Sequence, residues 1–304
     1  MKAFDTYSGT GWGLGCQRVG IHEVGCDNMP AVLSTRAANG MRTPYQDVWD
    51  TMGLKSKSYD IKISSPPCQT FSPTGTGTGR RALDTMLDLI DSGIYRSPRR
   101  IRKFGENHDP RTALTLTPLF HVWRDMPEFV VFELVPTVLP VWERMAAELR
   151  SWGYHTYVSK MKMENYGVPQ TRTRAVLIAR YGADPTLPQE SRLVSMGSYL
   201  GWPKSWRNEW IQRSNYSDGR TGRGLRTAQQ QSFTITGKPP SWIPADTVDV
   251  VGTPGTRLPP WQAGALQTYP EEFDWRGSLS DQYQQIGNAV PPLFAEQVLR
   301  SLIS

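Results

Sequence analysis

Cysteine and histidine are scarce in this chain of 304 residues. Its three cysteines are Cys16, Cys26 and Cys68, and no two of them form a C-x-x-C pair. An odd and sparse set of this kind argues against a disulfide framework and for a reducing compartment. The four histidines are scattered without the spacing of metal ligands, so the sequence predicts no metal site.

Long apolar runs are also missing. No stretch approaches the roughly 20 apolar residues of a membrane-spanning helix. The first residues, MKAFD, lack the basic and then apolar pattern of a secretion signal. We therefore expect a soluble, cytoplasmic protein without a membrane partner. Since nothing resembles a leucine zipper or a large apolar patch, we also expect a monomer.

Positive charge and tryptophan are plentiful. The chain has 34 Lys and Arg against 28 Asp and Glu, a net charge of +6, and it contains 11 Trp. An excess of positive charge is compatible with a polyanionic partner. The length suits one large domain or a large and a small one.

The N-terminal part has the pattern of a nucleotide-binding α/β unit. We expect a strand at 2–7, a glycine-rich loop at 8–15, a second strand at 21–26 and a helix at 29–38. Glycines let backbone amides approach a ligand, and Asp27, at the end of the second strand, can hold ribose hydroxyls. Asp47, at the end of a third strand, would lie near the same ligand. The motif G-x-G-x-x-G itself is absent, so a structural turn is the alternative.

A cysteine held by two prolines follows the next expected strand, at 61–64. Residues 64–72 read SSPPCQTFS, with Cys68 directly after the prolines. Proline fixes φ and restricts the residue before it, so the segment is stiff. The carboxyl end of a strand is where α/β proteins bind ligands. Cys68 therefore suits a nucleophile, and an inert buried cysteine in a turn is the alternative.

Residues 73–110 are rich in glycine, arginine and serine. We expect a long loop with a short helix at 83–90, acting as a mobile lid over a phosphate backbone. A plain surface loop is the alternative reading. Its basic residues are Arg80, Arg81, Arg96, Arg99, Arg100, Arg102 and Lys103.

The next segment supplies further charged candidates. A buried strand is expected at 129–132, and Glu133 follows it directly. In a parallel sheet its carboxylate would lie on the same side as Cys68. A helix at 141–152 and strands at 155–161 and 175–179 come next. Arg172 and Arg174, just before the last strand, alternate and would share one face.

Beyond residue 181 the composition changes. Pro, Gly, Ser, Trp and Arg dominate to about residue 260, which predicts a smaller, irregular second domain with a short β-like segment at 233–236. Basic and aromatic residues interleave, which suits nucleic acid, although a solvated surface with packed tryptophans is the alternative. A final helix at 293–302 would return to the large domain.

Five motifs occur in the order found in DNA (cytosine-5) methyltransferases. They are DTYSGTG at 5–11, PPCQTFS at 66–72, FELV at 132–135, QTRTR at 170–174 and GNAV at 287–290. Together they resemble this family over nearly the whole chain, and especially its compact bacterial and phage members.

The resemblance implies an α/β fold with two domains. A Rossmann-like catalytic domain, 1–182 and 263–304, would bind S-adenosylmethionine, and a small irregular target-recognition domain would span 183–262. The partner would be double-stranded DNA, in a bacterial cell or a phage-infected host. The thiolate of Cys68 would attack C6 of a flipped-out cytosine, so that C5 can accept a methyl group.

The resemblance also implies roles for individual residues. Catalysis would fall to Cys68, Glu133, Arg172 and Arg174. Residues near the cofactor would be Tyr7, Gly9, Gly11, Asp27, Asp47, Pro67, Asn288 and Val290. Residues near DNA would be Gln69, Ser72, Arg80, Arg81 and Thr234.

Three departures from the family keep other readings open. Leu134 replaces an asparagine, Asp27 replaces a glutamate, and the segment RLPPWQ at 257–262 lacks the usual Thr and Glu. One alternative is a tRNA cytosine-5 methyltransferase that uses the same Cys68 and Glu133. Another is an inactive DNA-binding homologue, favoured by Leu134. A third is an NAD-type oxidoreductase, which leaves the Pro-Pro-Cys motif unexplained. The first two departures could also reflect a modified cofactor or target base.

Overall fold

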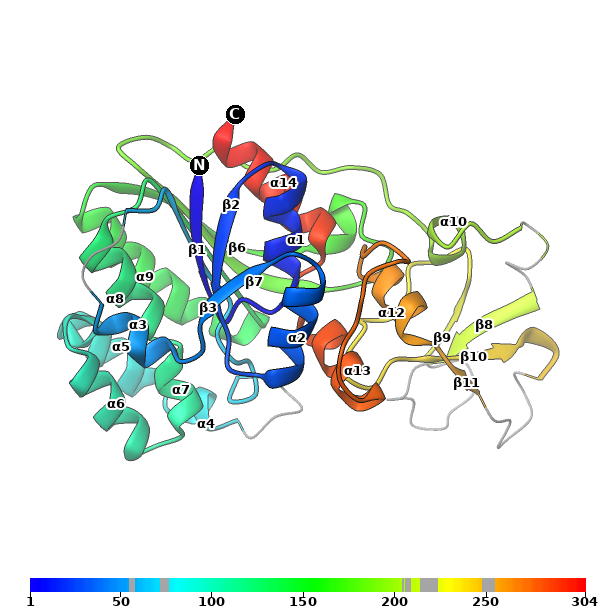
Figure 1. Ribbon diagram of the computed structural model, residues 1–304, viewed down its shortest axis with the longest axis horizontal. Coiled ribbons are helices and arrows are strands. Elements are labelled where there is room, and N and C mark those ends of the chain that lie inside the picture. Colours follow the sequence, from blue (N-terminus) through cyan, green and yellow to red (C-terminus); the bar gives the residue numbers. More distant parts are fainter. Residues whose placement is uncertain (55–57, 72–76, 204, 206–208, 214–223, 248–254) are drawn as a thin grey trace.

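Two sheets organise the chain in the computed structural model (Figure 1). The structure describes residues 1–54, 58–71, 77–203, 205, 209–213, 224–247 and 255–304. The large sheet contains β1 (Lys2–Thr6), β2 (His22–Cys26), β3 (Arg42–Tyr45), β4 (Ile61–Ser64), β5 (Phe129–Leu134), β6 (Tyr154–Lys162) and β7 (Thr173–Tyr181). The small sheet contains β8 (Trp210–Arg213), β9 (Leu225–Thr227), β10 (Ser241–Pro244) and β11 (Thr256–Arg257).

The strand order of the large sheet locates a ligand site. The order is β3-β2-β1-β4-β5-β7-β6, and β7 runs antiparallel to both its neighbours while β3, β2, β1, β4 and β5 are parallel. The chain reverses its direction of travel across the sheet between β1 and β4. Open α/β sheets bind ligands beyond the carboxyl ends of the strands at such a point. The expected site is therefore at the ends of β1 and β4.

Helices cover both faces of the large sheet, because its central strands are apolar on both sides. In β5, Val130 and Phe132 pack into one core cluster, whereas Phe129 and Val131 pack into another. One face carries α1 (Gly11–Arg18), α2 (Pro30–Ala38) and α14 (Pro292–Ile303). The other carries α3 (Val48–Met52), α5 (Leu83–Asp91), α6 (Pro98–Glu106), α7 (Pro110–Leu114), α8 (Thr117–Asp125) and α9 (Leu139–Ser151).

Four further α-helices occur among the described residues. They are α4 (Thr78–Arg81), α10 (Met196–Tyr199), α12 (Pro260–Leu266) and α13 (Leu279–Asn288). Of these, α10 and α12 lie beside the small sheet in Figure 1. The side chains of α12 and α13 join those of the small sheet in one core cluster with Trp242 and Ile235. The α/β fold class is confirmed, and so are the strands predicted at 2–7, 21–26, 61–64, 129–132, 155–161 and 175–179 and the helices at 29–38, 141–152 and 293–302.

Several local predictions were wrong. The loop predicted at 8–15 turns into helix α1 at Gly11, and the third strand ends at Tyr45. Asp47 instead caps α3, since its carboxylate accepts a bond from Trp49 N at 2.9 Å. Glu133 lies within β5 and not after it.

The stretch 73–110, predicted as a loop with one short helix, is largely helical where the structure describes it. Ser97 and Asp109 cap α6 and α7 with their side chains, and proline occupies the first turn of each helix. Ile101 and Phe104 bury one side of α6. The helix-capping and apolar residues of α6 were difficult to recognise in the sequence, because four of its nine residues are basic.

The segment 233–236 is not a strand. An isolated bridge joins Ser232 to Gln170, and the ladder goes no further. The backbone of Ile235 is held by side chains instead, because its N–H donates to Gln170 Oε1 at 2.8 Å and its carbonyl accepts from Arg172 at 3.1 Å. The rest of this region contains the four-stranded sheet, which the composition did not predict.

Candidate functional site

A cavity lies beyond the carboxyl ends of β1 and β4, where the strand order predicts it. Many residues singled out from the sequence line it: Tyr7, Gly9, Gly11, Asp27, Pro67, Cys68, Gln69, Glu133, Arg172, Arg174, Asn288 and Val290. Asp47, Arg80, Arg81 and Thr234 do not line it. Ser72 lies outside the described residues.

Cys68 and Glu133 enter this cavity from neighbouring parallel strands. Ser64, the last residue of β4, pairs with Phe132 of β5. Cys68 follows Ser64 by four residues and Glu133 follows Phe132 by one, so both lie near the same end of the two strands. Glu133 is 4% exposed, and Arg174 Nε donates to its Oε1 at 3.0 Å. Burial raises the pKa of the Cys68 thiol, the Arg174 and Arg172 guanidiniums oppose this shift, and Glu133 adds to it.

Arg172 binds backbone carbonyl groups from two distant segments. Its Nη1 donates to Ile235 O at 3.1 Å, and its Nη2 donates to Gly287 O and Ala289 O at 3.0 Å each. Burial lowers the pKa of Arg172 to about 9, so the guanidinium stays charged at neutral pH. These bonds tie the GNAV segment at the cavity wall to the segment around Ile235.

The glycine loop is fixed by acidic and basic side chains. Asp27 accepts bonds from Gly9 N at 2.9 Å and Met29 N at 3.0 Å, and burial raises its pKa. The fully buried Arg36 donates to Gly9 O at 2.9 Å and pairs with Glu23 at 2.7 Å. These contacts set the loop at the wall of the cavity.

Two glycines allow close backbone approach. A Cβ atom at Gly11 would overlap the carbonyl oxygen of Val290, and one at Gly287 would overlap the backbone of Thr236 and Gly237. Gly11 therefore lets the loop meet the GNAV segment. Gly287 lets that segment pack against the chain next to Ile235.

The cavity walls contain buried polar atoms that lack a hydrogen-bond partner within the described structure. They are Ser8 Oγ, Gln69 Oε1, Arg172 Nε and Gln285 Oε1. Buried polar groups are rarely left unpaired, so this wall fits a polar ligand. An aromatic ring, a carboxylate and a glycine loop beside apolar Met29 and Val32 are the groups that would suit a nucleoside-containing cofactor.

Sequence reasoning missed part of this wall. Ser8 lies within the motif at 5–11 and Gln285 lies two residues before the motif at 287–290, so their places in the chain could have revealed them. Trp12 donates to Ser65 Oγ at 3.0 Å, joining the glycine loop to the cysteine loop. Met29 and Val32 gave no signal, because they look like ordinary apolar residues of a helix.

The residues proposed for DNA lie around the cavity. Arg80 and Arg81 are exposed on α4, and Gly79 N donates to Thr70 O at 3.0 Å, so α4 is joined to the loop of Cys68. Thr234 donates its hydroxyl proton to Thr171 O. Among the described residues, no three or more His, Cys, Asp or Glu side chains form a group able to hold a metal ion. No helix in the described ranges is long and apolar enough to cross a membrane.

Comparisons with known proteins agree with this geometry. The family model of C-5 cytosine-specific DNA methylases matches residues 105–192 and 191–304. Type II methyltransferase M.AplI of Arthrospira platensis is 25% identical over 335 aligned positions, covering 99% of this chain and 85% of that protein. Type II methyltransferase M1.HphI of Haemophilus parahaemolyticus is 25% identical over 344 positions, covering 100% and 87%.

Solved structures share the fold. The Entamoeba histolytica methyltransferase EhMeth has a TM-score of 0.66 at 14% identity, covering 100% of this chain and 98% of that one. A DNA modification methyltransferase, described as putative and encoded in an E. coli prophage, has a TM-score of 0.63 at 18% identity with the same coverage.

Proposed function

Because the chain belongs to the C-5 cytosine-specific DNA methylases and is a DNA (cytosine-5) methyltransferase, we propose that it methylates C5 of a cytosine in double-stranded DNA. The cytosine would be flipped out of the duplex, and Cys68 would form a covalent bond to its C6 atom. The observation that carries this proposal is one cavity shared by Cys68, Glu133, the glycine loop and the GNAV segment. A cytosine ring within a duplex cannot reach a thiol in such a cavity, so the base must leave the stack.

The cofactor is S-adenosylmethionine, held by the part of the cavity nearest β1. Gly9 and Gly11 would line the methionine end, Asn288 and Val290 would close the cofactor site, and Pro67 would face the cofactor from the cysteine loop. Asp27 would hold the ribose hydroxyls and Tyr7 would pack on the adenine. Asp47, which caps α3, would act near the adenine amine from outside the cavity wall. When bound, the cofactor supplies an electrophilic methyl group.

The protein groups then act on the base. The Cys68 thiolate adds to C6 and the electron pair moves toward C5, while the side chain of Glu133, which would have to be protonated when the base is bound, donates its proton to N3. Arg174, which contacts Glu133, would hold the base carbonyl by a charge-assisted bond. After C5 is substituted, a solvent water molecule would take the C5 proton, the bond between C6 and sulfur would break by β-elimination so that Cys68 leaves as the thiolate, and N3 would return its proton to Glu133.

Residues 1–182 and 263–304 form the catalytic domain in this proposal, and 183–262 form the target-recognition domain. The contact of Ile235 with Arg172 supports a recognition domain docked against the catalytic residues. Gln69, Ser72, Arg80, Arg81 and Thr234 would contact the DNA, with the two exposed arginines neutralising phosphates.

Trapping on a duplex containing 5-fluorocytosine tests the function. Fluorine at C5 blocks the final elimination, so incubation with S-adenosylmethionine should give a covalent complex that mass spectrometry maps to Cys68. Cys68→Ser should give no complex while still binding the cofactor. A complex with RNA and none with DNA would favour the tRNA reading. Cofactor binding without any complex would favour an inactive homologue.

A further inference from the structure

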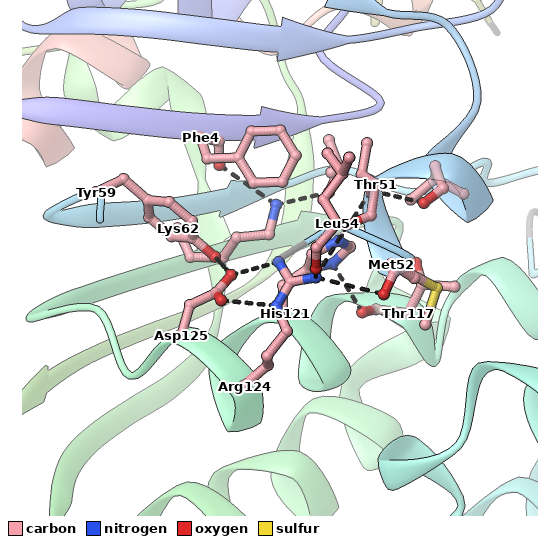
Figure 2. A network of polar contacts seen from close by, with 12 residues as sticks. Phe4, Thr51, Met52, Leu54, Tyr59, Lys62, Thr117, His121, Arg124 and Asp125 are labelled. Carbon is pink, nitrogen blue, oxygen red and sulfur yellow. Dashed lines mark hydrogen bonds and ion pairs between the residues drawn. The ribbon is translucent and has the colours of Figure 1, made fainter. Parts of the chain in front are cut away.

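Helix α8 turns a polar face toward the sheet beside the cavity. Thr117, His121, Arg124 and Asp125 are spaced as i, i+4, i+7 and i+8, so they share one side of the helix. Thr117 and His121 are fully buried. Figure 2 shows His121, Arg124 and Asp125 meeting residues of α3 and Tyr59.

Arg124 and Asp125 fasten this helix to its neighbours. Arg124 Nη1 donates to Thr51 O at 3.0 Å and Leu54 O at 3.2 Å, at the end of α3. Arg124 also donates to both carboxylate oxygens of Asp125 at 2.6 Å, and Tyr59 donates to the same carboxylate at 2.6 Å. These bonds fix α8 relative to α3 and to the chain entering β4 (Figure 2).

Tyr7 is the cavity residue that depends on this helix. Its hydroxyl oxygen is 2.8 Å from Thr117 Oγ1, which in turn donates to Leu114 O at 2.9 Å. The Tyr7 hydroxyl also donates to Leu114 O at 3.3 Å, so the hydroxyls of Tyr7 and Thr117 and this carbonyl form one hydrogen-bonded group. Burial raises the pKa of Tyr7, which keeps the phenol protonated and able to donate.

The backbone of Tyr7 has an unusual conformation, which makes the hydrogen bond of its hydroxyl group more important for holding the side chain. Its φ of 60° lies in the left-handed region that residues other than glycine rarely adopt. Such a conformation persists only where the surroundings fix it strongly. The strained backbone at one end and the hydroxyl bond at the other hold the Tyr7 side chain, which lines the cavity.

His121 contacts the backbone carbonyl of Thr117 one turn earlier in α8. Its Nδ1 is 3.1 Å from Thr117 O, and its Nε2 is 3.0 Å from Thr51 Oγ1. Because a carbonyl oxygen only accepts, Nδ1 carries the proton, and the Thr51 hydroxyl beside Nε2 also donates to Val48 O at 2.6 Å. Burial and the nearby cations lower the pKa of His121, which keeps the ring neutral. Tyr7, α8 and α3 thus form one hydrogen-bonded chain.

We propose that Thr117 and His121 are positioning residues that orient the Tyr7 ring against the adenine of the cofactor, through the Tyr7 hydroxyl. The inference rests on the proposed function, because it takes S-adenosylmethionine as the ligand of the cavity. A phenylalanine at position 7 would keep the aromatic ring but lose the hydroxyl group that bonds to Thr117. The ring would then turn more freely, and ordering it would oppose cofactor binding.

Calorimetric binding of S-adenosylhomocysteine, without DNA or turnover, tests this inference. Tyr7→Phe and Thr117→Val should each weaken binding about fivefold, the effect expected of one neutral hydrogen bond. The double variant should bind no more weakly than Tyr7→Phe, because Tyr7→Phe already removes the bond to Thr117 that Thr117→Val removes. Thr117→Ser should restore binding, since serine keeps the hydroxyl.

Thr112→Val is the matched control. Thr112 is a fully buried threonine of the adjacent helix α7, and its hydroxyl has no hydrogen-bond partner within the described structure. This variant should bind S-adenosylhomocysteine as the original chain does. Unchanged binding by Tyr7→Phe, or additive losses in the double variant, would overturn the inference while leaving the proposed function intact. Absence of binding by the original chain would instead count against the proposed function.

Discussion

Arg174 Nε donates to Glu133 Oε1 at 3.0 Å across the antiparallel strands β7 and β5. The carboxylate that would hold the target base is therefore already paired with the cation that would hold its carbonyl oxygen. Cys68 lies in the same cavity, where the two charges act on its thiol in opposite directions. The rate at which the Cys68 thiol is alkylated should therefore depend on the charges of Glu133 and Arg174.

Alkylation of Cys68 by iodoacetamide in the absence of DNA should be slow at neutral pH and rise with pH. Burial raises the pKa of the thiol, so the thiolate fraction grows only above the ordinary value near 9.0. Glu133→Gln should speed the reaction at a fixed pH, and Arg174→Met should slow it, by up to about tenfold for one pKa unit. Mass spectrometry of the modified peptide measures both rates.

The other cysteines provide an internal reference for this experiment. Cys16 and Cys26 are 0% and 2% exposed, and burial raises the pKa of both, so they should stay unmodified. Cys68→Ser should abolish the labelling. Slower labelling of Glu133→Gln than of the original chain would contradict the assigned charge effects.

Arg172→Met should destabilise the fold and weaken the binding of both cofactor and DNA. The substitution leaves the carbonyl groups of Ile235, Gly287 and Ala289 buried without their donor. A loss of about 3 kcal/mol in the free energy of unfolding is expected from such a change. Urea unfolding measures it, with the exposed Arg192→Met as a control that should change little. A variant as stable as the original chain would show that these bonds contribute nothing.

The short-range signals in the sequence located the side of the sheet that carries the cavity. Cys68 and Glu133 follow or end strong apolar strands, and Asp27 follows another, so all three could be placed at one edge from strand order alone. The contacts of Arg172 could not be predicted in this way. Its partners Ile235 and Gly287 are 63 and 115 residues away, and nothing local in the chain indicates a backbone carbonyl as the acceptor.

The local sequence also led to wrong predictions at positions where the same residues fit two kinds of secondary structure. Asp47 after an extended segment can end a strand or cap a helix, and the bond from Trp49 N decides for the cap. Residues 98–106 were read by their basic composition, although Ser97, Pro98, Ile101 and Phe104 carry the helix signal. The small sheet consists of strands of two to four residues, too short for a clear period-two pattern.

Arg80→Gln with Arg81→Gln should weaken DNA binding and reduce its dependence on salt. Both side chains are exposed on α4, next to the loop that carries Cys68. Each lost phosphate contact should lower the slope of log affinity against log salt by about 1. Fluorescence anisotropy with a labelled duplex at several salt concentrations measures the slope. Arg300→Gln on α14, at the opposite side of the molecule in Figure 1, should leave it unchanged. An unaltered slope in the double variant would place these arginines outside the DNA contact.

Lys62 is a cation in the middle of the sheet. It is fully buried in β4, and its Nζ donates to Thr6 Oγ1 and Ile63 O at 2.7 Å each, and to Phe4 O at 3.3 Å (Figure 2). No ion pair joins it to a carboxylate in the described part of the chain. Burial lowers its pKa to about 7, although the charges of Asp5, Cys26 and Asp125 oppose the shift and that of Arg124 adds to it.

Lys62 should make the protein more stable as the pH rises above neutral. Between its folded pKa of about 7 and its ordinary value of 10.5, the unfolded chain holds a proton on Lys62 that the folded chain lacks. Raising the pH across this window therefore favours the folded state. Lys62→Met should exceed the original chain in unfolding free energy by about 1–3 kcal/mol near pH 6, because it removes an unpaired buried charge. The advantage should shrink toward pH 10, while the exposed Lys160→Met should show no such trend in urea unfolding. A Lys62→Met variant that is less stable by the same amount at every pH would show that Lys62 stays charged and contributes favourably through its bonds to Thr6 and Ile63.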